Sequence, residues 1–281
     1  MHRPRSYRSA RSDADNERMN PMLATQGTPF FRAGNFLLER SNLGALMAGA
    51  FGRLPQSLRS QVLEAATMQY VPARSPVFGR DEPAPVCVGV VSGAVRLGSA
   101  LVDGRNMTLD VLGPGDFFAD LACARATHDL ETIADSRLVV LKAEALRRLM
   151  QREPDFTLFV AQTLSSHLQV AYQAAAHLLE ASLEERTLIK LLDLSAKFGV
   201  RRDDEVCIDL PIVQQDIADM VGCSRQRLNV AVRELVLSGT VRLSQRPRRI
   251  FLRGSNVPAR VLPEQGRFAS DATASSVRHC R

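Results

Sequence analysis

The pattern of apolar and polar positions changes character along the chain. Residues 54–70 carry apolar side chains at helical spacing, opened after Pro55, and predict a short amphipathic helix. From position 71 the apolar residues instead form short β-type runs, at residues 86–91, 94–97, 107–111 and 137–141. Turn signals separate these runs, at Ser92-Gly93, Asp103-Gly104 and Gly113-Pro114-Gly115. Many short strands with regular glycine-bearing turns predict an antiparallel sandwich or barrel.

Helical spacing returns at residues 143–152 and again from Pro154 onward. In the second of these segments, apolar and small residues step by four, three, four and three: Leu164, Leu168, Ala171, Ala175 and Leu178. This heptad seam fits two helices that pack on each other, and it also fits a helix that faces the core of its own domain. We expect a dimerisation helix.

Residues 210–252 predict two short helices joined by a glycine turn and followed by a two-stranded ribbon. Gly222 stands at the turn, because glycine adopts left-handed backbone angles at little cost, and Ser224 is placed to cap the second helix. Gly239 is a natural stop for that helix. The apolar positions that would pack the two helices together are Ile217, Ala218, Val221, Leu228, Val232, Leu235 and Val236.

The ribbon has the pattern of a wing. Residues 240–243 and 250–252 read as two apolar strands, and we expect Arg246, Arg248 and Arg249 in the turn between them. Such a turn would follow the phosphate backbone of a nucleic acid. Together these features predict a winged helix-turn-helix.

Charge and side-chain chemistry point to duplex DNA as the partner. Residues 221–260 contain nine arginines and a single acid, Glu234, and a patch of one sign is the footprint of a polyanion. We expect Arg225, Gln226 and Asn229 on the groove side of the second helix. We expect phosphate contacts from Ser224, Arg227, Arg246, Arg248 and Arg249. Arg233 is a further expected DNA contact, able to reach phosphates or base edges. An alternative is a partner-binding protein whose helix-turn-helix no longer contacts DNA, and the arginines of the wing argue against it.

The length of 281 residues allows two compact domains and tails, and the formal net charge is +6 with a pI near 9.4. The predicted organisation has five parts: a disordered basic arm (1–35), a β-roll sensor domain (36–152), a dimerisation helix (153–185), a winged helix-turn-helix (186–254) and a flexible tail (255–281). The five cysteines are scattered, which suits a reducing cytoplasm, and no apolar run is long enough to span a bilayer.

Three motifs make the resemblance to a known family specific. They are a turn-and-strand segment with Gly113, Gly115, Asp116, Phe117, Phe118, Asp120 and Leu121, the segment at residues 133–141, and GCSRQ at the start of the second helix. Over roughly residues 50–253 the chain resembles the CRP/FNR family of bacterial transcription regulators. The resemblance implies an α+β fold in which a β-roll senses a signal, a long helix dimerises, and a winged helix-turn-helix binds a palindromic site. It also implies RNA polymerase as a partner.

Family members that bind cyclic AMP hold it with an acid and an Arg-Ser pair in the β-roll. By this resemblance the acid is Asp120 and the pair falls on Ala126-Thr127, while Arg125 is one step off register, where a strand would direct it to the opposite face. The corresponding effector pocket is degenerate, with Gly115, Phe118, Asp120, Leu121, Arg125 and Thr127. We expect no cyclic nucleotide, since a buried phosphate needs a counter-charge. The alternative is a regulator gated by cyclic AMP or cyclic GMP.

No cofactor, metal or catalytic activity is expected. The segment before position 86 has no cysteine, so the N-terminal thiolates of an iron–sulfur cluster are missing. Haem ligation by His128, His167 or His177 is an alternative, although a lone histidine is more often an ordinary residue. A cupin-like metal enzyme would need several histidines and carboxylates in the strand region, which contains only His128. Cys223 is either a redox switch beside the DNA or a buried residue that fills the turn.

Overall fold

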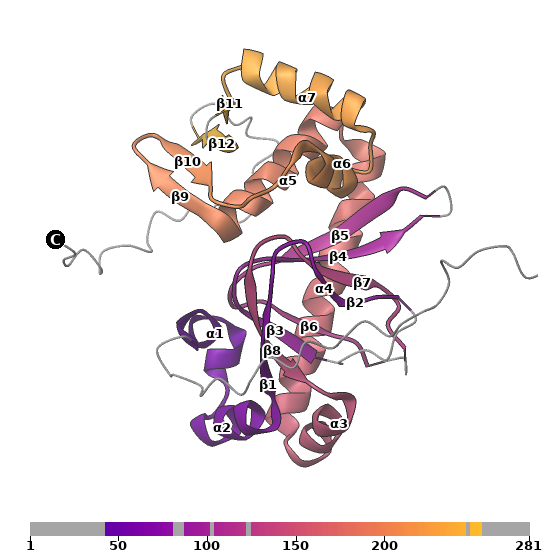
Figure 1. Cartoon of the computed structure of the whole chain (residues 1–281), viewed down its shortest axis with the longest axis vertical. Coiled ribbons are helices and arrows are strands. Elements are labelled where there is room, and N and C mark those ends of the chain that lie inside the picture. Colours follow the sequence, from indigo (N-terminus) through magenta and orange to yellow (C-terminus); the bar gives the residue numbers. More distant parts are fainter. Residues whose placement is uncertain (1–42, 81–86, 102–103, 122–124, 246–247, 255–281) are drawn as a thin grey trace, which may run out of the picture. The chain divides into compact units, whose positions relative to one another are not determined.

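The computed structural model describes residues 43–80, 87–101, 104–121, 125–245 and 248–254 (Figure 1). The predicted arm (1–35) and tail (255–281) lie outside these residues. All the described residues belong to one compact unit, Asn35–Arg281. Among them, no helix is both long and apolar enough to cross a membrane.

The N-terminal half is built of antiparallel strands, as the short apolar runs predict, and forms the β-roll that the family resemblance implies. One sheet has the strand order β1-β8-β3-β6 and the other β2-β7-β4-β5, and every pairing is antiparallel. The strands are β1 (Thr67–Val71), β2 (Pro76–Phe78), β3 (Cys87–Ser92), β4 (Val95–Ala100), β5 (Asn106–Leu112), β6 (Phe117–Ala119), β7 (Asp129–Thr132) and β8 (Ser136–Leu141). Apolar side chains from both sheets form one buried cluster that includes Phe78, Val88, Val95, Leu130 and Leu138.

The prediction of one helix over residues 54–70 is wrong at its C-terminal end. Helix α2 spans Gln56–Ala65, and Thr67–Val71 forms strand β1, which pairs with β8. The apolar spacing of a few residues fits either state, and the hydrogen bonds offered by β8 decide for the strand. Strands β2, β6 and β7 were not predicted either, because they have only three or four residues each.

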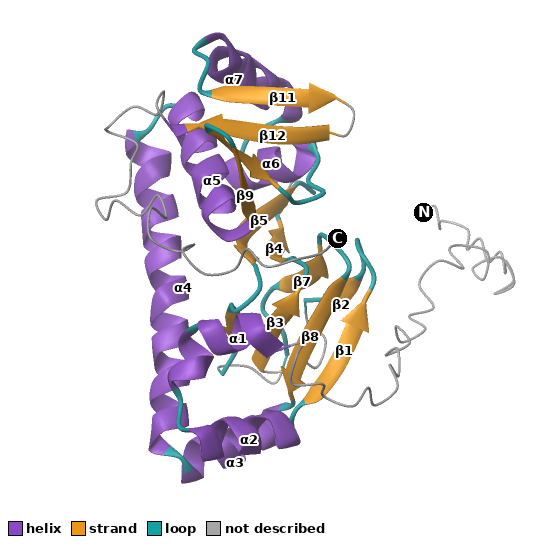
Figure 2. Ribbon diagram, turned by 90° about the vertical axis from the view of Figure 1, so that its left-hand side faces the viewer, coloured by secondary structure: helices purple, strands orange, loops and turns teal. Residues whose placement is uncertain are grey.

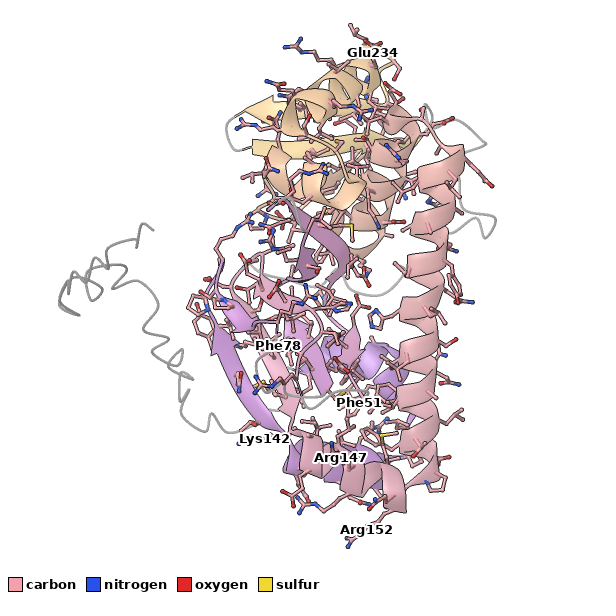
Figure 3. All side chains as sticks on the ribbon, turned by 90° about the vertical axis from the view of Figure 1, so that its right-hand side faces the viewer. Phe51, Phe78, Lys142, Arg147, Arg152 and Glu234 are labelled. Atoms are coloured by element: carbon pink, nitrogen blue, oxygen red, sulfur yellow. The ribbon has the colours of Figure 1, made fainter. Side chains whose placement is uncertain are left out.

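Helices cover the outer face of the first sheet. Before α2 come α1 (Gly44–Ala48) and a 3-10 turn at Ala50–Arg53. Phe51 of this turn stacks on Phe117 of β6 with ring centroids 5.3 Å apart, and Phe117 meets Phe159 edge-on at 5.1 Å. Phe51 and Phe78 point into the interior of the domain, whereas Arg152 points outward (Figure 3).

Two helices follow the β-roll as predicted, α3 (Ala143–Arg152) and the long α4 (Pro154–Glu180). Pro154 opens α4, where its missing N–H and fixed φ suit the first turn. In Figure 2, α4 begins beside α3 and runs past the strands of the β-roll towards α5. A new helix, α5 (Leu183–Phe198), begins at a capping box between Ser182 and Glu185, so the expected domain boundary at 185 falls inside it.

The C-terminal half is a winged helix-turn-helix, as predicted. Helices α6 (Gln214–Val221) and α7 (Arg225–Leu237) pack with α5. The sheet has the order β11-β12-β10-β9, with β9 (Gly199–Arg202), β10 (Glu205–Ile208), β11 (Val241–Gln245) and β12 (Arg248–Arg253). The sequence prediction contained only the last two strands. The β9–β10 hairpin was missed because Gly199–Arg202 is exposed at every position and shows no alternation.

Candidate nucleic-acid interface

The turn between α6 and α7 has the geometry that the sequence predicts. Gly222 ends α6 in the left-handed region, with φ 70° and ψ 40°. Ser224 caps α7, since its side-chain oxygen accepts a hydrogen bond from the backbone N–H of Arg227 at 3.4 Å. Gly239, with φ +73°, follows the end of α7. This turn fixes the direction in which α7 leaves α6.

Helix α7 buries one face and exposes the other. Leu228, Val232 and Leu235 are buried as predicted, together with Ala231. The prediction that Val236 packs inward is wrong, because its side chain is 41% exposed. Position 236 is one residue past the buried row, and one residue rotates a side chain by about 100° around a helix.

The exposed face of α7 carries the residues assigned to DNA contact. Arg225, Gln226 and Arg233 are exposed and Asn229 is half-buried, so all are accessible along one side of the helix. Ser224 and Arg227 are exposed at its N-terminal end. Val230 lies on the same side and is 56% exposed. No contact role is predicted for this residue from the sequence, although an apolar side chain on a groove-facing surface can contact the methyl group of thymine.

The wing arginines are arranged differently from the prediction. Arg248 and Arg249 belong to strand β12 and do not lie in the turn; Arg246 and the side chain of Arg248 lie outside the described residues. Arg249 forms an ion pair with Asp209. The strand is longer than predicted because its backbone continues to pair with β11 as far as Gln245 and Arg248.

Two other arginines are anchored by one buried acid. Glu205, which is 7% exposed, accepts hydrogen bonds from Arg242 and from Arg253, the latter at 2.9 Å. The guanidinium of Arg242 also lies 3.8 Å from the centroid of the Phe251 ring. The hydrogen bonds from Arg242, which have the largest effect, and from Arg253 outweigh burial and lower the pKa of Glu205 below its ordinary value. The acid therefore stays charged and holds both cations in place.

Cys223 has the surroundings of a packing residue. It is 7% exposed, and burial raises the pKa of its thiol, although Arg227 and Arg186 act in the opposite direction. A raised pKa disfavours the reactive thiolate. Cys87 and Cys207 are buried too, and burial raises the pKa of Cys87 to about 12. The remaining cysteines, Cys123 and Cys280, lie outside the described residues.

The candidate effector pocket is partly assembled in the β-roll. Thr127 donates a hydrogen bond to Asp120 at 3.3 Å, and both Arg125 and Thr127 are exposed. Between them Ala126 is 2% exposed and belongs to the apolar cluster between the sheets. Residues 125–128 do not form a strand, so the expected strand alternation does not apply, although Arg125 is exposed where its neighbour Ala126 is buried.

Two other pocket positions, Phe118 and Gly115, have contacts that stabilise the fold. Phe118 is buried in the cluster between the sheets, whereas Leu121 is 41% exposed. Gly115 has φ +95° and donates its N–H to the carbonyl of Val90 at 2.9 Å, which ties the turn to β3. A side chain at position 115 would be strained in this conformation.

The three histidines named in the sequence lie in different places. His167 of α4 contacts Asp110 at 3.4 Å and the carbonyl oxygen of Phe117 at 2.8 Å. His128 precedes β7, and His177 is in the last turn of α4. Among the described residues, no group of three or more histidine, cysteine or acidic side chains is arranged to hold a metal ion.

The seam of α4 is mostly uncovered in the single chain. Leu164 packs on the core of the β-roll, but Leu168 and Leu178 are 51% and 54% exposed, and Ala171 and Ala175 are exposed as well. Four of the five seam residues therefore do not face the core of their own domain. Tyr172 and Leu179, 66% and 89% exposed, extend this apolar surface.

Comparisons with known proteins agree with this architecture. A model of the cyclic nucleotide-binding domain matches residues 68–153, and a model of the Crp-like helix-turn-helix domain matches residues 185–254. A CRP-like cAMP-activated global transcriptional regulator of Mycobacterium tuberculosis is 28% identical over 195 residues, or 67% of this chain and 87% of that protein. The nitrogen fixation regulation protein FixK of Azorhizobium caulinodans is 29% identical over 215 residues, or 76% of this chain and 86% of the relative.

Solved structures show the same fold. FixK2 from Bradyrhizobium japonicum matches with a TM-score of 0.60 and 25% identity, over 67% of this chain and 92% of that one. The regulator CLP of Xanthomonas campestris matches with a TM-score of 0.62 and 22% identity, over 71% of this chain and 100% of that one.

Proposed function

Since the chain belongs to the CRP/FNR family of DNA-binding transcriptional regulators, we propose that it binds a palindromic operator as a homodimer and needs no cyclic nucleotide to do so. The observation that carries this proposal is the exposed face of α7, on which Arg225, Gln226, Asn229 and Arg233 are accessible beside an arginine-rich wing. Such side chains can form hydrogen bonds with base edges and phosphates. Selection of operators from a randomised duplex library tests it. Recovery of a two-fold symmetric motif supports the proposal, and recovery of no motif contradicts it.

The case for a homodimer rests on the apolar surface of α4. Leu168, Tyr172, Leu178 and Leu179 are each at least half exposed on a single helix. A contiguous apolar surface of this kind is unfavourable in water and is typical of an interface. Two copies of α4 that pack along the seam would bury it. A two-fold dimer would also place its recognition helices about one DNA turn, ~34 Å, apart, as a palindromic operator requires.

Replacement of both Leu168 and Leu178 by glutamate tests the dimer. Two pairs of like charges would face each other across the seam, so we expect the variant to sediment as a monomer where the unchanged protein is a dimer. We expect its operator affinity to fall by about 100-fold, since the second half-site no longer contributes avidity. Gln173→Glu, which adds one charge on the opposite side of α4, should leave both properties unchanged. A monomeric unchanged protein would contradict the proposal.

Independence from cyclic nucleotides is supported by the environment of Ala126. By the family resemblance this position holds the arginine that binds the cyclic phosphate, and here it is an alanine in an apolar cluster. A buried phosphate without a counter-charge is costly. In calorimetric titrations with cyclic AMP and with cyclic GMP, we expect no saturable heat and no change in operator affinity. A saturable heat together with tighter operator binding would favour the alternative, a regulator gated by a cyclic nucleotide.

The remaining parts of the proposal concern partners and cofactors. We place the protein in the cytoplasm, with RNA polymerase as its protein partner and with no resident metal, haem or cluster. Support comes from the family, from the buried thiols of Cys87, Cys207 and Cys223, and from the dispersed histidines. Metal analysis and an absorption spectrum of the purified dimer test the last point, and a stoichiometric metal or a haem band would overturn it.

A further inference from the structure

Helix α6 is packed against the β-roll through an apolar core that belongs to both. Ile217 and Ala218 of α6 are in the same buried cluster as Ala94, Val111 and Ile133 of the β-roll. All of these side chains are less than a tenth exposed. The first helix of the DNA-binding unit is therefore packed in one position on the β-roll, and α7 is connected to that helix through the Gly222 turn.

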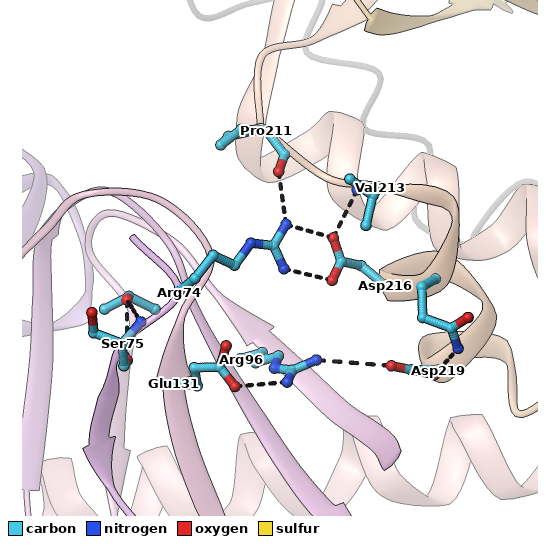
Figure 4. Close-up of polar contacts among 10 residues, drawn as sticks. Arg74, Ser75, Arg96, Glu131, Pro211, Val213, Asp216 and Asp219 are labelled. Carbon is cyan, nitrogen blue, oxygen red and sulfur yellow. Dashed lines mark hydrogen bonds and ion pairs between the residues drawn. The ribbon is translucent and has the colours of Figure 1, made fainter. Parts of the chain in front are cut away.

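An arginine of the β-roll binds the N-terminal end of α6. Arg74 forms a two-pronged ion pair with Asp216, with nitrogen–oxygen distances of 2.7 and 2.8 Å, and donates to the carbonyl of Pro211 at 2.9 Å (Figure 4). Asp216 also accepts a hydrogen bond from the backbone N–H of Val213 at 2.7 Å, which caps α6. The arginine thus holds the same carboxylate that starts the helix.

The turn that carries Arg74 is itself held in place. The backbone N–H of Arg74 donates to the carbonyl of Thr132 at 2.9 Å, and the N–H of Ser75 donates to the hydroxyl of Thr132 at 3.0 Å. Thr132 is fully buried. Arg74 has φ +59°, a conformation that is uncommon for residues other than glycine, asparagine and aspartate. These contacts direct the guanidinium towards α6.

A second arginine meets α6 one turn further on. Arg96 of β4 donates to Glu131 of β7 at 2.6 Å and lies 3.8 Å from Asp219 (Figure 4). The side chain of Arg96 is 18% exposed and that of Asp219 is 9% exposed. Asp219 also accepts a hydrogen bond from Gln215 at 2.7 Å. Asp216 and Asp219 are three residues apart and so lie on one side of α6.

The signs of these charges orient the helix pair. The acids of α6 face two arginines of the sensor, whereas the basic side of α7 is exposed. If α6 moved away from the β-roll, the nearly buried carboxylates of Asp216 and Asp219 would lose their counter-charges. A buried carboxylate without a charged partner is destabilising. The apolar core and the two ion pairs therefore favour one orientation of α7 relative to the sensor.

We propose that Arg74 and Arg96 are positioning residues for DNA binding, which hold α6 so that the two α7 helices of the dimer are set for one spacing of half-sites. This inference rests on the proposed function as a dimer on a palindrome. Neither arginine needs to touch DNA. Together with Asp216 and Asp219 they form what we call the docking pairs. The consequence is that the docking pairs control binding to two half-sites together and leave binding to one half-site unchanged.

The test compares three duplexes with full-length variants. The probes are an operator selected by the unchanged protein from a randomised library, the same operator with one half-site scrambled, and the operator with about half a helical turn, ~5 bp, inserted at its centre. The variants are Arg74→Asn, which tolerates the positive φ, Arg96→Gln, and the double variant. Arg148→Gln is the matched control, because it breaks the exposed ion pair with Glu144 within α3.

We expect the double variant to lose about ten-fold or more in the ratio of affinities for the full operator and the single half-site, since flexible docking lowers the effective concentration of the second site. The loss of affinity caused by the inserted base pairs should be smaller for the double variant than for the unchanged protein. The affinity of the double variant for the single half-site should stay unchanged. The control should behave like the unchanged protein. Equal losses on all three duplexes, or an unaltered ratio, would overturn the inference.

A double-mutant cycle separates positioning from loss of fold. If Arg96 acts through Asp219, then Arg96→Gln and Asp219→Asn should each lower the affinity ratio, and the second change should add nothing to the first. Fully additive effects would overturn the assignment of Arg96. If the unchanged protein recognises no palindrome, the proposed function fails. If the unchanged protein recognises a palindrome and the variants keep the same preference for half-site spacing, the proposed function stands and only the inference about the docking pairs fails.

Discussion

Arginines of the C-terminal half lie in two kinds of environment. Arg225 and Arg233 are exposed on α7, whereas Arg242, Arg249 and Arg253 form ion pairs with Glu205 or Asp209. A one-sign patch in the sequence predicts a polyanion partner, but it does not separate the arginines that stay exposed from those that form ion pairs within the wing. The pairing of strand β10 with strand β12 determines which arginines form ion pairs, because it brings Glu205 opposite Arg253.

Arg225→Ala should weaken operator binding by about 1–3 kcal/mol and relax the preference at one base pair, because a two-pronged contact to a base edge is lost. Competition gel shifts against operators changed at single positions measure both effects. An equal loss of affinity on every sequence would assign Arg225 to a phosphate and contradict its role as a base reader.

Glu205→Gln should lower the free energy of unfolding by about 1.5–3 kcal/mol, since hydrogen bonds to two charged guanidinium groups are weakened around a buried side chain. Urea unfolding followed by circular dichroism gives the value. Asp204→Asn, at the exposed neighbouring position, is the comparison and should change stability by less than about 0.5 kcal/mol. A similar effect of both substitutions would mean that Glu205 does not brace the wing.

At the level of elements, the long helix α4 and the turn between α6 and α7 are readable from the sequence, whereas the short strands and the separate start of α5 at Ser182 are not. The 27 residues of α4, the Gly222 turn and the Ser224 cap follow from local pattern and backbone preference. Strand β1 could not be predicted, because its five residues fit a helix until β8 supplies hydrogen-bonding partners. Ala126 shows the same limit in the candidate pocket, where burial is decided by packing between two sheets.

The contact of α4 with β5 and β6 includes a titrating group, His167. Burial opposes its positive charge, but Asp110 and the carbonyl of Phe117, both acceptors, outweigh burial and raise the pKa of His167 above its ordinary value. Lys197 of α5, which lies near Asp110 and Asp116, acts in the opposite direction on the histidine. The pKa of Asp110 is lowered, because His167 and Lys197 outweigh the effect of burial, so this acid stays charged.

The charged ring of His167 should stabilise the folded state fully below the ordinary histidine pKa of about 6.5, and this contribution should be lost as the pH rises through the raised pKa of the folded protein. Urea unfolding at a series of pH values from about 5.5 to 8.5 should therefore show a larger loss of stability for the unchanged protein than for His167→Gln. His177→Gln, on the same helix, should keep the steeper dependence. Parallel curves for all three proteins would refute the assignment.

At the scale of the whole molecule, the sequence predicts the modules and their order but not how they join. Pattern, charge and motifs indicate a β-roll, a long helix and a winged helix-turn-helix, and the structure has all three. The docking pairs were not predicted, since Arg74 and Asp216 are 142 positions apart and only the folded chain brings them together. A hydrophobic position such as Val111 likewise reads as core without any sign that its neighbours include α6.

The shared cluster of Ala94, Val111, Ile133, Ile217 and Ala218 has a practical consequence for protein engineering. Fusing the DNA-binding domain of another protein to this β-roll, with the junction after α4, would bring side chains without matching shape into this contact and leave the guanidinium of Arg74 without its ion-pair partner. Functional hybrids should require the transferred segment to include the matching surface of the β-roll. The exchangeable part of this regulator is thus larger than its helix-turn-helix.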